Sequence, residues 1–175
     1  MLVPHFYEDL NVMHDKTMPA RTYYIPASVR MNDLVEYRER SDRFQLLNGE
    51  WKFQYYNSIY DVTESFYEKG YDVSGFDQVT VPGVWQMDGY DTHQYTNIRY
   101  PFPFDPPYVP QDIPCGAYVH NFEYHREKKA PKAFLNFEGV DSCFYVWVNG
   151  AYAGYSQVPH ATSEFDVTDL LNEGE

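Results

Sequence analysis

The amino-acid sequence predicts an all-β fold, an antiparallel β-sandwich. Several short stretches alternate apolar with polar residues, which is the period of a strand with one buried face. Asn-Gly pairs and prolines separate these stretches, as turns separate the strands of a sandwich. No part of the chain alternates strand patterns with long helical patterns, which disfavours a parallel α/β fold. The 175 residues suffice for a domain with a single core.

The first regular strand follows the turn signal Asn48-Gly49. Trp51, Phe53 and Tyr55 recur at every second position, which places them on one face of a strand. A second short strand is predicted over 78–81, because the next residue is a proline and cannot continue the ladder.

Two short helices are also expected. One covers 63–69, with Thr63 as a possible N-cap and Gly70 just past its end. The other lies between 32 and 43 and has only weak caps.

The strongest strand signals lie in the last third of the chain. Apolar residues alternate over 118–124, 133–137 and 144–148. The pair Asn149-Gly150 then predicts a hairpin with a returning strand over 151–156, because both central residues of a type I′ turn need positive φ. Tyr145 and Trp147 make the 144–148 strand apolar on its second face too. A second layer is therefore expected over that face, formed by a long loop or by a further domain.

The remaining parts of the chain carry prolines and little periodicity. Residues 1–45 are expected to form an extended N-terminal arm, and 46–175 the sandwich domain. Residues 82–116 form a long loop that holds seven of the twelve prolines and seven aromatic residues. Loops of this length are usually functional or disordered, and so many aromatic rings disfavour disorder. The loop either presents side chains to a ligand or plugs one end of the sandwich.

Composition excludes several classes of partner. Thirteen basic and 26 acidic residues give a net charge of −13, so nucleic acid and anionic membrane are not expected to bind. Aromatic residues make up 19 % of the chain, which suits a β core and also a carbohydrate site. The two cysteines form no disulfide framework and no zinc spacing. We expect a cytoplasmic protein, because neither a signal peptide nor a transmembrane run is visible.

Three groups of motifs together resemble a known family, the large β-galactosidases of glycoside hydrolase family 2. The resemblance is to their N-terminal jelly-roll, galactose-binding-domain-like sandwich, and it covers roughly 44–175. The WQM-GYD and YTN–YPFP segments point to galactosidases rather than to other members. The motifs are LNGEWKF at 47–53, VPGVWQMDGYD at 81–91, YTN at 95–97, YPFP at 100–103, FEGVDS at 137–142, VWVNG at 146–150, GYS at 154–156 and SEFD at 163–166.

The resemblance implies that the full protein hydrolyses terminal β-D-galactosides with retention of configuration. Two glutamates about 5 Å apart would act from a later (β/α)₈ barrel that is absent from this chain. The chain would therefore be a truncated sandwich that is inactive by itself, and no catalytic role is assigned to its glutamates, such as Glu50, Glu64 and Glu138. Magnesium and sodium would bind elsewhere in the full protein, so no cofactor or metal site is expected in this part of it, and the protein is expected to be a homo-oligomer.

The resemblance implies a sugar-binding role for one residue of this chain. Asn97, in the YTN segment, would reach the galactosyl pocket, where its carboxamide offers a donor and an acceptor to sugar hydroxyls. The competing interpretation is that Asn97 only hydrogen-bonds its own loop. Cys115 and His160 stand where the chain departs from the family pattern. Cys115 inherits no role, and His160 is either a polar contact or a solvated loop residue.

Two other functions remain open for the chain. It could be a free-standing carbohydrate-binding module, which the aromatic loop favours. It could also be a structural or oligomerisation domain without sugar contact, which the N-terminal arm favours.

Overall fold

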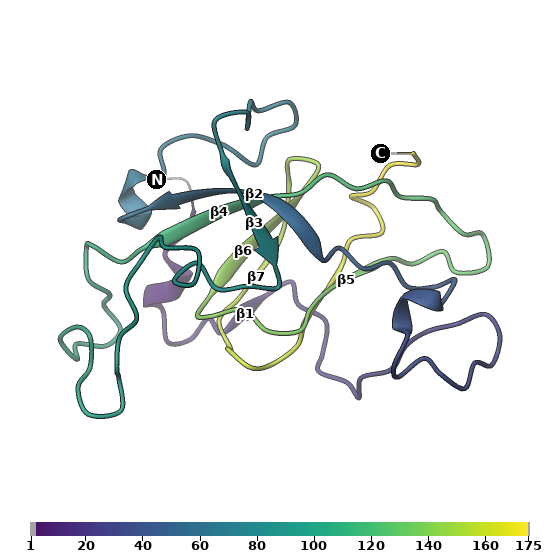
Figure 1. Ribbon diagram of the computed structural model, residues 1–175, viewed down its shortest axis with the longest axis horizontal. Coiled ribbons are helices and arrows are strands. Elements are labelled where there is room, and N and C mark those ends of the chain that lie inside the picture. Colours follow the sequence, from purple (N-terminus) through teal and green to yellow (C-terminus); the bar gives the residue numbers. More distant parts are fainter. Residues whose placement is uncertain (1–2, 175) are drawn as a thin grey trace.

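The computed structural model describes residues 3–174 and is an all-β sandwich (Figure 1). Its only helical elements in that range are three short 3₁₀ turns, η1 (Phe6–Glu8), η2 (Arg38–Arg40) and η3 (Ile59–Asp61). The two expected helices were therefore wrong. Within 32–43 only η2 forms, and 63–69 forms turns that place Phe66 and Tyr67 against Trp147. Tertiary packing of these rings overrides a weak local helix preference.

The described residues form eight strands in three antiparallel sheets. One sheet has the order β1-β7-β6, the second has the order β3-β2-β4, and β5 pairs with β8. The strands are β1 (His14–Asp15), β2 (Gly49–Tyr56), β3 (Asp77–Val81), β4 (Cys115–Val119), β5 (Phe134–Phe137), β6 (Phe144–Val148), β7 (Ala151–Ser156) and β8 (Ser163–Asp166).

The β6–β7 hairpin forms where the sequence predicts it. Asn149 and Gly150 have φ values of 52° and 80°, as a type I′ turn requires. Val148 pairs with Ala151, and a bulge follows between Val146 and Trp147. The predicted strands at 51–56, 78–81 and 133–137 are also confirmed, as β2, β3 and β5.

The strand expected over 118–124 is shorter than predicted. β4 ends at Val119, which pairs with Lys52 of β2, and no ladder continues through 120–124. The apolar residues of this stretch are nevertheless partly buried. Phe122 and Tyr124 pack against the core. The alternation therefore predicted the burial of Phe122 and Tyr124 but not that of Tyr118, which is 37 % exposed beside the buried Ala117. The stretch 120–124 forms no strand, because it has no ladder partner in the described part of the chain.

The core lies between β6, β7 and β8 and the segment that follows β8. Phe165 is fully buried, and Phe137 and Phe144 meet its ring edge-to-face at 6.0 and 6.1 Å. Offset and edge-to-face aromatic pairs of this kind add to the stabilisation that burial provides. The other buried members of the cluster are Val146, Val148, Ala153, Val167 and Leu171.

The outer face of β6 is covered from within the chain. Tyr67 stacks on Trp147 at 4.5 Å between ring centroids and an angle of 5°, and Phe6 stacks on Tyr145 at 6.2 Å. Residues 6 and 66–67 therefore form a second layer over Tyr145 and Trp147, whereas the cover by a further domain stays a prediction.

The N-terminal arm lies along the sandwich. Its strand β1 pairs with β7 through His14 and Ser156, and Thr17 forms a bridge with Phe165. Arg21 forms an ion pair with Glu164 further along. The arm thus extends a sheet of the sandwich. The boundary between 45 and 46 stays a prediction.

Gly154 makes the contact between the arm and the core possible. A Cβ at this position would lie 2.5 Å from the Asp15 carbonyl oxygen and 2.6 Å from the Phe165 ring, and φ is 155°.

We predict that Gly154→Ala lowers the free energy of unfolding of the chain by about 1–3 kcal/mol, because overpacked sites must shift backbone or rings. Chemical denaturation followed by tryptophan fluorescence measures this change. Gly75→Ala is the matched control, because its Cβ would meet nothing within 4 Å; equal effects of the two substitutions would contradict the prediction.

Candidate functional site

The long loop leaves β3 at Pro82 and returns to β4 at Cys115. Its first part is packed against the β3-β2-β4 sheet. Tyr90 meets Phe53 edge-to-face at 4.8 Å, and Trp85 lies edge-to-face on Tyr55 at 5.7 Å. Gly116 is required beneath this cover, because a Cβ there would lie 2.8 Å from the Trp85 ring. Residues 85–90 are therefore a packed structural part of the loop, as one interpretation predicted, whereas the closing of one end of the sandwich stays a prediction.

The distal part of the same loop is exposed (Figure 1). Tyr95 is 78 % exposed and Phe104 is 76 % exposed, and the rings of Tyr100 and Phe104 contact one another at 5.7 Å. So much apolar surface on one loop is unusual for a face that meets only water. The large apolar residues exposed between 92 and 108 are Tyr95, Ile98, Tyr100, Phe102, Phe104 and Tyr108.

Asn97 lies in this exposed part, beside Tyr95. Its Nδ2 donates a hydrogen bond to the Tyr95 hydroxyl at 2.9 Å. This bond uses one of the two donor hydrogens, and the carboxamide oxygen and the second hydrogen make no other hydrogen bond in the described part of the chain. The sequence singled out Asn97 but assigned nothing to Tyr95, although the two share the YTN segment.

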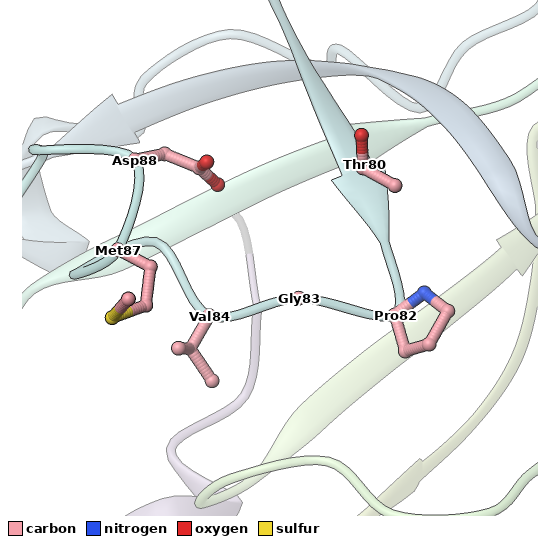
Figure 2. Close-up of a pocket in the computed structure, with 6 residues that line it drawn as sticks. All are labelled: Thr80, Pro82, Gly83, Val84, Met87 and Asp88. Atoms are coloured by element: carbon pink, nitrogen blue, oxygen red, sulfur yellow. The ribbon is translucent and has the colours of Figure 1, made fainter.

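A shallow groove lies where the loop leaves β3 (Figure 2). Its volume is about 560 Å³, and Figure 2 shows Val84 and Met87 projecting from one side of the turn and Asp88 from the other. The groove is open, and its apolar side chains are exposed. Its lining residues are Thr80, Pro82, Gly83, Val84, Met87 and Asp88.

Glu50, Glu64 and Glu138 all have structural partners. Glu50 accepts hydrogen bonds from Gln78 and Thr80 at 2.9 Å each, and Glu64 accepts one from Tyr71. For Glu138, burial acts to raise the pKa, but hydrogen bonds from Arg38 and Tyr23 outweigh it and leave the pKa below its ordinary value. An ionised, paired carboxylate is a poor general acid at neutral pH.

Metal ligands are not brought together in the described part of the chain. Within residues 3–174, no group of three or more His, Cys, Asp or Glu side chains lies close enough to hold an ion. The binding of magnesium and sodium elsewhere in the full protein, which the family resemblance implies, stays a prediction. No helix between residues 3 and 174 is both long enough and apolar enough to span a bilayer.

His160 and Cys115, which stand where the chain departs from the family pattern, have different surroundings. His160 is exposed at a turn, with a φ of 60°. Cys115 is a free thiol on β4, and burial, together with the nearby Cys143, raises its pKa from 9.0 to about 11. The thiolate is the reactive form of cysteine, so the half-buried Cys115 is a poor nucleophile at neutral pH.

The chain belongs to the glycosyl hydrolases family 2, as its sugar-binding domain. The model of that domain matches residues 44–175, which include β2 to β8 and the long loop. The family that these motifs suggested from the sequence is therefore confirmed, and the all-β sandwich agrees with the fold that the resemblance implies.

Two curated relatives that match nearly the whole chain have the same name, beta-galactosidase. A protein named beta-galactosidase from Actinobacillus pleuropneumoniae is 44 % identical over 174 residues, covering 99 % of this chain and 17 % of the relative. A beta-galactosidase from Staphylococcus xylosus is also 44 % identical and covers 100 % of the chain and 17 % of the relative. The chain thus spans about a sixth of the length of these relatives.

A solved structure supports the fold independently. A beta-glucuronidase from an uncultured Clostridium species matches 74 % of this chain and 20 % of its own, with a TM-score of 0.50 and 23 % identity. At that identity, the likeness concerns the sandwich alone.

The buried thiol on β4 makes stability depend on alkaline pH. A group whose pKa is higher in the folded state stabilises that state fully below its unfolded pKa and loses this contribution as pH rises through the folded value. We predict that Cys115 contributes a fall in stability between about pH 9 and pH 11. Denaturation midpoints of the wild type and Cys115→Val at pH 8 and pH 10.5 measure it. The wild type should lose more stability than the variant, which retains the alkaline titration of the tyrosines; equal losses would contradict the prediction.

Proposed function

We propose that this chain is the N-terminal sandwich of a β-galactosidase that hydrolyses terminal β-D-galactosides with retention. The observation that carries the proposal is the 44 % identity that runs along the whole chain to relatives named beta-galactosidase. The catalytic carboxylates would lie in a barrel outside this chain, since Glu50, Glu64 and Glu138 are engaged in structural contacts. The cytoplasmic location and homo-oligomeric assembly expected from the sequence are part of this proposal.

In this proposal, the distal loop shapes the galactosyl pocket. Asn97 would point its free carboxamide groups at a sugar hydroxyl, while Tyr95 holds the side chain in place through its hydroxyl. A polar group that is buried by substrate without a partner is costly, so such a residue discriminates between sugar epimers. The exposed rings of the loop would be covered by the remainder of the enzyme, which explains why they are apolar.

A free-standing carbohydrate-binding module is the second candidate. The exposed rings of Tyr95, Tyr100 and Phe104 favour it, because sugars stack on aromatic faces. Against it stands the shape of the surface. The groove beside the loop is shallow and open, whereas small-molecule sites usually enclose most of their ligand. A scaffold or assembly role is compatible with the first proposal.

We predict that Asn97→Ala in the full-length enzyme lowers kcat/KM for a galactoside by about 10- to 100-fold, the effect of losing one hydrogen bond to a desolvated polar group. Steady-state kinetics with a chromogenic galactoside measures it. Gln94→Ala is the matched control, because it removes an exposed carboxamide from the same loop. Wild-type kinetics in Asn97→Ala, with folding unchanged, would remove Asn97 from the pocket.

We predict that residues 1–175 alone neither hydrolyse nor measurably bind galactosides, because other walls of the pocket would be missing. Isothermal titration with galactose and lactose tests this. Binding at millimolar concentration or tighter would instead favour the free-standing module.

A further inference from the structure

Glu8, at the end of η1, joins the N-terminal segment to the returning limb of the long loop. Its Oε1 accepts a hydrogen bond from the backbone N–H of Val109 at 3.1 Å. Its Oε2 lies 3.0 Å from Nδ1 of His5. The Glu8 side chain is only 17 % exposed, so water competes weakly for these bonds. A carboxylate that accepts from a backbone N–H makes a stronger bond than a neutral acceptor does.

The residues around Glu8 are themselves fixed to the sandwich. Phe6 packs on Tyr145 and on the fully buried Tyr155, at 6.2 and 5.4 Å between ring centroids. The Tyr145 hydroxyl donates to the Pro4 carbonyl at 2.5 Å. The carboxylate of Glu8 therefore projects from a segment that the β6–β7 hairpin holds in place.

The returning limb has further ties to η3, but they lie closer to β4. The Ser58 hydroxyl donates to the Gln111 carbonyl, and the Ile59 N–H donates to the Ile113 carbonyl at 3.1 Å. In the part of the chain that the structure describes, Val109 is the first residue after Asn97 that hydrogen-bonds outside the loop. The Glu8–Val109 bond is thus the tie nearest to Asn97 on this limb.

We propose that Glu8 is a positioning residue of the galactosyl pocket: it anchors the loop at Val109 and thereby sets where Asn97 is held. The consequence for catalysis rests on the proposed role of Asn97, whereas the anchoring itself does not. Because small misplacements of a contact residue cost much of the rate, a hydrogen bond at the base of an exposed limb can control a contact that it does not itself make.

Hydrogen exchange tests the anchoring. In the 175-residue chain, Glu8→Ala should speed exchange of the Val109 amide roughly tenfold or more, the factor expected for one charge-assisted hydrogen bond. Glu8→Gln keeps a neutral acceptor oxygen, so its exchange rate should lie between those of Glu8→Ala and the wild type. Asp9→Ala is the control, because within residues 3–174 that exposed carboxylate accepts hydrogen bonds from Asn11 alone. Faster exchange should be confined to the loop; unchanged exchange, or equal acceleration in β6 and β7, would overturn the proposal.

Kinetics of the full-length enzyme test the positioning. Glu8→Ala should lower kcat/KM for a galactoside by roughly 10-fold or more, and Glu8→Gln, which keeps a neutral acceptor, should restore part of it. Faster exchange at Val109 with wild-type kinetics would overturn the positioning role, provided that Asn97→Ala is impaired. If Asn97→Ala has wild-type kinetics, the role given to Asn97 fails, and the Glu8 anchor is then decided by the exchange measurement alone.

Discussion

The β6–β7 hairpin is buried on both faces, and the rest of the structure depends on this packing. On the inner face, Val146 and Val148 join the core around Phe165. On the outer face, Tyr145 and Trp147 are covered by Phe6 and Tyr67. A strand with two apolar faces needs two partners, and in this chain both come from distant parts of the sequence. The hairpin therefore orders the N-terminal segment as well as the core.

This order extends to the loop that carries the candidate site. Residues 85–90 rest on Phe53 and Tyr55 of β2, which fixes the outgoing limb. Glu8, on the segment that the hairpin holds, fixes the returning limb at Val109. Between these anchors, the loop extends into solvent with Asn97 and its exposed rings. A rigid scaffold with an exposed loop is a common way to present binding residues.

The sequence predicted local features well, namely turns and most strands. The turn at Asn149-Gly150 could be predicted because type I′ geometry restricts both residues, and alternation identified most strands. The helix over 63–69 was wrong because a weak helix preference gave way to the packing of Phe66 and Tyr67 against Trp147. Contacts between distant segments, such as Glu8 with Val109 or β1 with β7, leave no periodic signal in either partner. Asn97 could be proposed only from the family motif, since an exposed loop asparagine has no distinctive pattern of its own.

Strand β1 protects an edge of the sandwich, a role separate from that of the candidate site. It covers the free edge of β7, and Phe6 covers the rings of Tyr145 and Tyr155. An unprotected edge with apolar rings beside it is a template for pairing with other chains. The family match starts at residue 44, whereas the elements that shield this edge come earlier. The unit that sequence comparison recognises therefore leaves out the strand that pairs with β7, and a chain trimmed to the family boundary would present that edge and its rings unprotected.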